Sequence, residues 1–104
     1  MSMNIRWTRT GQIKGSKVME AVAWSKEMSS WVAKKYNVTV DTWLDTAGAL
    51  NTMRWTVDYQ DLASFDKTMT SVMMDPEYWK YIDKAMKAEI FIDGAGNDTI
   101  SKKM

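Results

Sequence analysis

The sequence predicts an α+β domain in which helices cover one face of a four-stranded antiparallel sheet. Apolar residues recur with helical spacing in the long stretch Lys17–Tyr36, which contains neither proline nor glycine. Apolar and polar residues alternate in Met3–Thr10 and Thr52–Tyr59, as is typical of half-buried strands. The single proline, Pro76, divides a second helical region. A chain of 104 residues fits one domain, residues 1–104, with a single core.

The first expected strand is Met3–Thr10, which places Ile5 and Trp7 on one face and Arg6 on the other. Residues 11–15 begin and end with glycine and are expected to connect this strand to the long helix.

In the helix Lys17–Tyr36 the apolar side chains occupy an arc of roughly 200°, whereas a stripe of ~100° suffices to pack on one neighbour. Trp24 and Trp31 lie one heptad apart at the edge of this arc. The width of the arc predicts that the helix covers more than a single neighbour. Asn37 is expected to end the helix in the left-handed conformation.

An antiparallel hairpin is expected next. Val38–Asp45 is rich in β-branched residues and alternates, and Thr52–Tyr59 alternates again with Trp55 on its apolar side. The segment Thr46–Asn51, which contains Gly48, is expected to be the loop between them.

Two further helices are predicted on either side of Pro76. Asp61 is expected to cap the first, which ends by Asp75, because a residue before proline avoids the helical conformation. Asp75 is expected to cap the second, with Pro76 as its first residue. The apolar stripe of the first consists of Leu62, Phe65, Met69, Val72 and Met73. The stripe of the second consists of Trp79, Ile82, Met86 and Ile90.

Gly94 and Gly96 are expected to end this region, and Asn97–Lys102 is expected to be the closing strand. The resulting order matches the split βαββαβ, or ferredoxin-like, arrangement. The second face of such a sheet is bare. If it carried Trp43 or the pair Met53 and Trp55, it would be a large apolar patch. A two-fold homodimer would cover that patch, so a second copy of the chain is the expected partner.

Composition excludes several classes of function. The net charge is +1, with 14 basic and 13 acidic residues interspersed, so no footprint for nucleic acid or an anionic membrane is expected. Cysteine and histidine are both absent. Disulfides, thiolate ligands, the usual general base and the commonest metal and haem ligand are therefore missing. No metal or cofactor is expected. Without an apolar run of spanning or signal-peptide length, we expect a cytoplasmic protein.

Methionine and tryptophan are abundant, at ten and six residues. Large adaptable side chains of this kind can line an apolar pocket for a small hydrophobic or aromatic molecule. The alternative is ordinary core packing. The candidate ligand-binding residues are Trp24, Met28, Trp31, Trp55, Phe65 and Met69.

Arg6 and Arg54 are the candidate catalytic residues, because they lie on the polar sides of strands that neighbour each other in the expected sheet. Two guanidinium groups on one face can hold a carboxylate or a deprotonated phenol. Alternatively, they pair with Asp41, Asp58 or an acid of a partner subunit, or face solvent. A one-residue slip in register would move each to the opposite face.

The C-terminal third resembles small proteins of the NIPSNAP and antibiotic-biosynthesis-monooxygenase-like groups. The resemblance is carried by the turn Asp75-Pro76-Glu77-Tyr78, the stretch Ala88-Glu89-Ile90-Phe91-Ile92 and the strand start Asp98-Thr99. It extends to the segments EAVAWSKEMSSWVAKKY and NTMRWTVDY. The resemblance implies a dimeric α+β barrel, in which two sheets pack face to face and an apolar cavity lies between each sheet and its helices.

The resemblance also implies a range of activities. Related members oxygenate quinone-like aromatics without a cofactor, degrade haem or dismutate chlorite, and the absence of histidine argues against the haem-dependent ones. Three hypotheses follow. The chain is a homodimer that binds a small hydrophobic or aromatic molecule, or a cofactor-independent monooxygenase, or a purely structural dimeric module. In the monooxygenase, the substrate anion would itself reduce oxygen, with Arg54 or Arg6 stabilising the negative charge.

Overall fold

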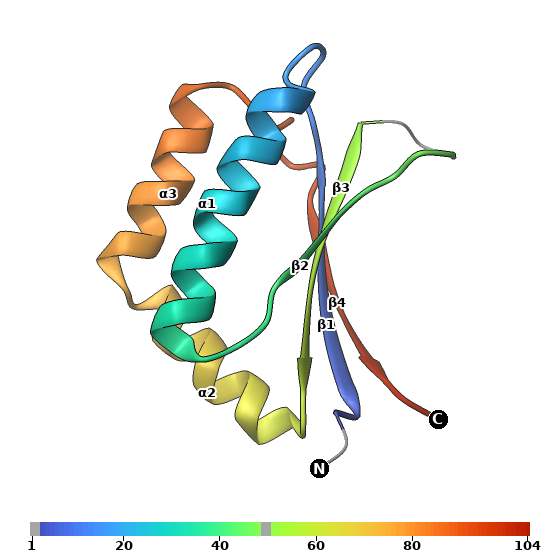
Figure 1. The fold of residues 1–104 in the computed structure, drawn as a ribbon, viewed down its shortest axis with the longest axis vertical. Helices are drawn as coiled ribbons and strands as arrows, with labels where there is room; N and C mark the ends of the chain where they lie inside the picture. The colour runs from blue at the N-terminus through green and yellow to red at the C-terminus, as the bar shows by residue number, and fades with distance from the viewer. Residues whose placement is uncertain (1–2, 49–50) are drawn as a thin grey trace.

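The computed structural model describes residues 3–48 and 51–104. Along the chain the elements are β1 (Ile5–Gln12), α1 (Val18–Tyr36), β2 (Asp41–Leu44), β3 (Thr52–Tyr59), α2 (Leu62–Met73), α3 (Pro76–Lys87) and β4 (Asn97–Lys102). The strands form one antiparallel sheet in the order β2-β3-β1-β4. All three helices lie on the same side of it (Figure 1). The predicted α+β, ferredoxin-like fold is confirmed. No helix in the described ranges is long and apolar enough to cross a membrane.

Helix α1 packs both on the helix side of the sheet and against α3 (Figure 1). Its buried residues are Ala21, Trp24 and Ser25, and the Trp24 Nε1 donates a hydrogen bond of 2.9 Å to the backbone oxygen of Tyr81 in α3. The helix ends as predicted, with Asn37 in the left-handed conformation at a φ of 54°. The wide apolar arc is thus explained, because this one helix packs on two neighbours.

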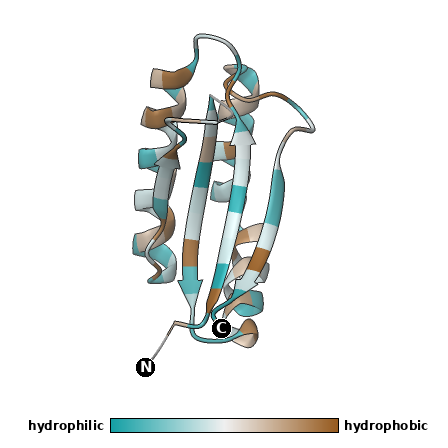
Figure 2. Ribbon diagram, turned by 90° about the vertical axis from the view of Figure 1, so that its right-hand side faces the viewer, coloured by the Kyte–Doolittle hydropathy of each residue, from teal (hydrophilic) through white to brown (hydrophobic). Residues whose placement is uncertain are grey.

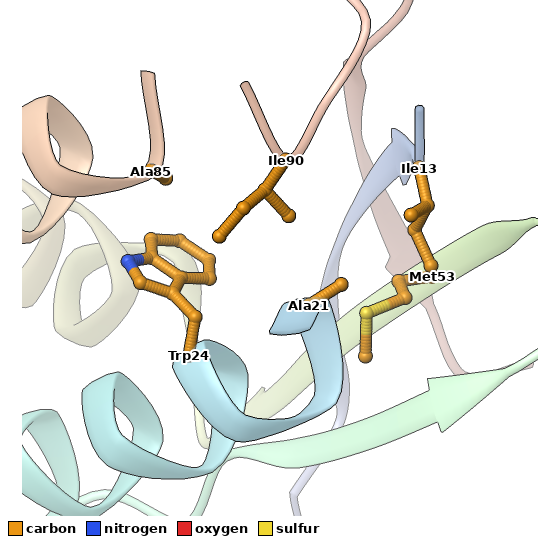
Figure 3. Packing of buried hydrophobic residues seen from close by; sticks show 6 residues of the cluster. All are labelled: Ile13, Ala21, Trp24, Met53, Ala85 and Ile90. Atoms are coloured by element: carbon orange, nitrogen blue, oxygen red, sulfur yellow. The ribbon is translucent and has the colours of Figure 1, made fainter. Parts of the chain in front are cut away.

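The main core cluster joins α1 to both central strands and to α3. It consists of Ile13, Ala21, Trp24, Met53, Ala85 and Ile90. Figure 3 shows the Trp24 indole extending from α1 towards Ala85 and Ile90. A second cluster, Ile5, Trp7, Val57 and Tyr59, lies further along the same face of β1 and β3.

Two strands differ from their predicted bounds. β1 begins at Ile5 and continues to Gln12, so Gly11, expected in a connection, pairs with Met53 of β3 instead. β2 is shorter than the predicted Val38–Asp45, because Val38 and Val40 pack beside the second core cluster and lie outside the ladder. β3 has the predicted bounds. Within the predicted loop 46–51, positions 49–50 lie outside the described residues.

The predicted apolar stripe of α3 is correct at Ile82, which packs against the main core cluster, and wrong at its other three positions. The helix ends at Lys87, and Glu89 takes a left-handed φ of 54°, so Ile90 lies beyond the helix. This turn returns the chain to the sheet, where the backbone N–H of Lys14 donates to the Ile90 oxygen at 2.8 Å. α3 buries Tyr78 and Ala85, whereas Trp79 and Met86 are 46% and 62% exposed. The caps are as predicted: Asp61 accepts from the Ser64 N–H, and Asp75 accepts from the Glu77 N–H.

The sheet face away from the helices, called here the free face, is polar (Figure 2). Alternation along the strands places Met53 and Trp55 on the helix side, so the predicted large apolar patch is wrong. Among the described residues, the strands of the free face carry one large apolar side chain, Trp43, which is 53% exposed. Its Nε1 donates to the Thr56 hydroxyl at 3.0 Å. The remainder includes threonines and two ion pairs: Thr8, Thr10, Thr99, Arg6–Asp58 and Arg54–Asp45.

Candidate functional site

A cavity of about 500 Å³ lies between the helices and the helix side of the sheet. It is lined by residues of β1, β3, β4 and all three helices, and by residues of the segments that lead into β2 and β4. Most of these side chains are apolar, so a ligand that enters the cavity would bury apolar surface against them.

Three aromatic rings form one wall of the cavity. Trp24, Trp55 and Phe91 all line it, and each ring meets the other two nearly edge to face. Their centroids are 5.4 to 6.2 Å apart. Rings in this arrangement support one another and present a preformed apolar surface.

Gly11 of β1 makes room for this wall. A Cβ atom added there would lie 3.1 Å from the Cη2 and Cζ3 atoms of Trp55 and 3.5 Å from the Cδ1 of Phe91. Since real Cβ atoms rarely approach so closely, a side chain at position 11 would push Trp55 away from β1. The close approach explains why a glycine lies within this central strand.

A polar cluster borders the same cavity. The Arg9 guanidinium donates from Nε and Nη2 to the two Asp98 carboxylate oxygens at 2.7 and 2.9 Å. Its Nη1 donates to the Tyr78 hydroxyl oxygen at 2.8 Å, and the Trp7 Nε1 donates to Asp98 at 3.2 Å. All four residues line the cavity. They come from β1, α3 and β4, so the sheet pairing and the packing of α3 bring them together.

The Arg9–Asp98 pair is ionised across the ordinary pH range. Burial would raise the pKa of Asp98, but hydrogen bonds from Arg9 and attraction to its charge together hold that pKa below its usual value. The hydrogen bond with Asp98 outweighs burial at Arg9 and raises the pKa of the guanidinium. The cluster therefore contains one positive and one negative charge.

Of the residues predicted to bind a ligand, the structure brings four together around the cavity. These are Trp24, Met28, Trp55 and Met69. Trp31 lies elsewhere, against Tyr36 and Tyr81 at centroid distances of 6.0 and 5.4 Å. Phe65 packs edge-on against Tyr59, at a centroid distance of 5.5 Å.

The two predicted catalytic arginines lie on the free face, on the opposite side of the sheet from the cavity. Arg6 contacts both carboxylate oxygens of Asp58, at 2.8 and 3.1 Å. Arg54 contacts both oxygens of Asp45, each at 3.1 Å. Arg6 thus pairs with Asp58, which is one of the alternatives given above. Arg54 also pairs with an aspartate, Asp45, which is not among the partners expected from the sequence.

Sequence reasoning missed Arg9, Tyr78 and Asp98. The signal for Arg9 was present, because Ile5 and Trp7 were correctly placed on the buried face and alternation extends that face to residue 9. Tyr78 was treated only as part of a turn motif. Tyr78 is buried because α3 packs against the rest of the domain with the face that carries Tyr78 and Ala85. Among the described residues, no group of three acidic side chains is placed to hold a metal ion.

Comparison with known proteins gives a consistent set of similarities. A family model described as NIPSNAP matches residues 8–102. A NIPSNAP-like domain protein from Burkholderia xenovorans has 14% identity and a TM-score of 0.81, covering 100% of this chain and 88% of the other. A NIPSNAP family protein from Agrobacterium tumefaciens has 15% identity and a TM-score of 0.79, covering 100% and 89%.

A third similar structure comes from Deinococcus radiodurans and is described provisionally as an antibiotic biosynthesis monooxygenase. It has 11% identity and a TM-score of 0.71, with 96% of this chain and 92% of the other covered. At these identities the likeness concerns the fold alone. No curated protein sequence matches the chain.

Proposed function

This chain belongs to the NIPSNAP family, and we propose that it binds a small hydrophobic or aromatic molecule in the cavity between its helices and its sheet. The observation that carries the proposal is the cavity of about 500 Å³, apolar over most of its wall and bordered by one polar cluster. Ligand pockets commonly combine apolar walls with a few polar groups that fix the ligand's orientation.

The aromatic wall supports the proposal. Trp24, Trp55 and Phe91 hold one another in place, so little side-chain ordering would accompany binding. Flat apolar molecules make extensive contact with such rings. Meanwhile Arg9 and Tyr78 offer hydrogen-bond donors at the border of an otherwise apolar space.

Two neighbouring serines of α1 allow a matched test. Ser29 lines the cavity, whereas Ser30 is exposed. Naphthalene is titrated into protein carrying ¹³C-labelled methionine methyl groups, and the methyl resonances are followed by NMR. Met28 and Met69 line the cavity, whereas Met19 and Met74 are 77% and 79% exposed.

We expect saturable shifts at Met28 and Met69 in the wild type and in Ser30→Phe. We expect them to be lost in Ser29→Phe, because its ring would occupy the cavity. Shifts confined to the exposed methionines, or equal shifts in both variants, would contradict binding in this cavity.

A second candidate is a cofactor-independent monooxygenase acting on a quinone-like aromatic. The fold similarity to the Deinococcus protein supports it, as does a guanidinium at the cavity. Arg9 would then replace Arg6 or Arg54 as the residue that stabilises a substrate anion. Oxygen uptake with a hydroquinone tests this candidate. A rate equal to that of the Arg9→Ala variant would exclude Arg9 from the reaction.

We also propose that the chain forms a homodimer through the free face. The resemblance to dimeric α+β barrels supports this proposal, and the exposed Trp43 offers one apolar contact at that face. A purely structural dimeric module is the remaining alternative, and it would leave the cavity without a ligand.

A further inference from the structure

We infer that the cavity selects an uncharged ligand bearing a hydrogen-bond acceptor oxygen, such as a ketone, quinone or ester, over organic anions and cations. This inference rests on the proposed binding function and assigns a chemical class to its ligand. Three groups carry it: the guanidinium of Arg9, the carboxylate of Asp98 and the hydroxyl of Tyr78.

The charges of the polar cluster disfavour ionic ligands. Arg9 and Asp98 face each other through two hydrogen bonds of 2.7 and 2.9 Å, so their charges largely cancel. An anionic ligand approaching Arg9 would also approach Asp98, and a cationic ligand would meet the reverse arrangement. Neither would recover the hydration that it loses on entering an apolar cavity. An uncharged molecule loses much less.

The Tyr78 hydroxyl group has a proton that a ligand can accept. The Tyr78 hydroxyl oxygen accepts a bond from Arg9, which leaves the hydroxyl proton to be donated. None of the hydrogen bonds among the described residues uses that proton. Tyr78 is only 5% exposed and lines the cavity, so water has limited access to it. Asp98 already accepts three hydrogen bonds. The cluster therefore offers a donor, and an acceptor oxygen on the ligand complements it.

The first test compares probes with one skeleton: naphthalene, 2-acetylnaphthalene, 2-naphthoate and 2-naphthylmethylammonium. Affinities come from the Met28 and Met69 methyl shifts described above. We expect the ketone to bind about five- to tenfold more tightly than naphthalene, which corresponds to one net hydrogen bond. We expect both ions to bind at least about tenfold more weakly than the ketone. Tyr78→Phe keeps the ring and should remove only the ketone's advantage.

The second test changes the charge balance. Asp98→Asn leaves Arg9 unpaired beside the cavity, so 2-naphthoate should gain about tenfold or more in affinity, and this gain should shrink in high salt. Arg9→Gln leaves Asp98 unpaired and should favour 2-naphthylmethylammonium instead. The matched control is Asp58→Asn, which removes the same type of partner from Arg6 on the free face and should leave every affinity unchanged.

The possible failures are distinguishable. If naphthalene shifts Met28 and Met69 but 2-naphthoate binds the wild type as tightly as the ketone, the ligand class is wrong and cavity binding stands. The same conclusion follows if neither charge variant changes the ionic probes' affinities. If no probe shifts these methyl groups, both the proposed function and this inference are overturned.

Discussion

At the scale of single residues, two glycines beside the cavity have different neighbours. A Cβ added to Gly11 would meet the ring of Trp55 at 3.1 Å. Trp55 lines the cavity, so its ring can shift slightly away from β1 while it keeps its contacts within the aromatic wall. A Cβ added to Gly96 would meet the backbone oxygen of Thr10, also at 3.1 Å. Thr10 is held within β1 between two neighbouring strands, so that oxygen cannot easily yield.

We therefore expect Gly11→Ala to change the free energy of unfolding by less than about 1 kcal/mol, because the reduced entropy of the unfolded chain offsets a small ring movement. Gly96→Ala should destabilise the protein by about 1–3 kcal/mol, as is usual when a group is forced into a filled space. Urea denaturation of both variants and the wild type measures the difference. Equal losses in the two variants would show that Trp55 is held as rigidly as the backbone.

The residues that the sequence placed correctly share a strong local signal. Trp24 and Met28 follow helical periodicity, and Trp55 follows strand alternation. The polar cluster lacked such a signal, because Arg9 and Asp98 are distant in the sequence and meet only through the pairing of β1 with β4. A charged residue at a buried strand position indicates a partner. The sequence does not say which acid that partner is.

At the scale of elements, a buried aspartate joins the end of α1 to the start of α3. The Asp75 carboxylate accepts from the Lys35 Nζ at 2.6 Å and from the Tyr36 hydroxyl at 2.5 Å. It also accepts the Glu77 N–H at 3.0 Å, which caps α3. Together these bonds lower the pKa of Asp75 to about 2, and the bond from Lys35 has the largest effect.

This pKa predicts how stability depends on pH. An unfolded aspartate titrates near ~3.9, so the native state favours the ionised carboxylate. The stabilising contribution is complete above about pH 4 and is lost as the pH falls towards 2. At pH 6, we expect the Asp75→Asn variant to have a lower thermal unfolding midpoint than the wild type. At pH 2.5, the difference between the two midpoints should be smaller. Asp66→Asn, an exposed aspartate of α2, is the control. A gap that persists at pH 2.5 would contradict this linkage.

Elements with complete end signals were predicted closely. Asn37 after α1 and the Asp75–Pro76 pair before α3 mark their boundaries in the sequence. The end of α3 has no such mark, because the left-handed position after it is Glu89 and not glycine or asparagine. The sequence pattern therefore predicts a stripe that continues to Ile90 and includes the exposed Trp79 and Met86. The tertiary bond between Ile90 and Lys14 decides that boundary, and no local pattern encodes it.

At the scale of the whole molecule, the proposed homodimer would form through the free face. The sequence predicts a dimer only if this face is apolar, whereas the described part of the face carries threonines, two ion pairs and one exposed tryptophan. Polar interfaces retain water and gain less from apolar burial. A dimer formed through this face should therefore be weaker than one held by an apolar core, and it should dissociate at a higher protein concentration.

Light scattering at increasing concentration tests this expectation. We expect the mass to approach twice the 12.0 kDa of the chain at high micromolar concentration and to fall on dilution. Trp43→Ala should weaken the dimer, because Trp43 is the large apolar side chain that this face can bury. Trp79→Ala is the matched control, since Trp79 is similarly exposed but lies on α3, on the helix side of the sheet. A monomeric mass at all concentrations would contradict the dimer. Equal weakening by both variants would place the contact elsewhere.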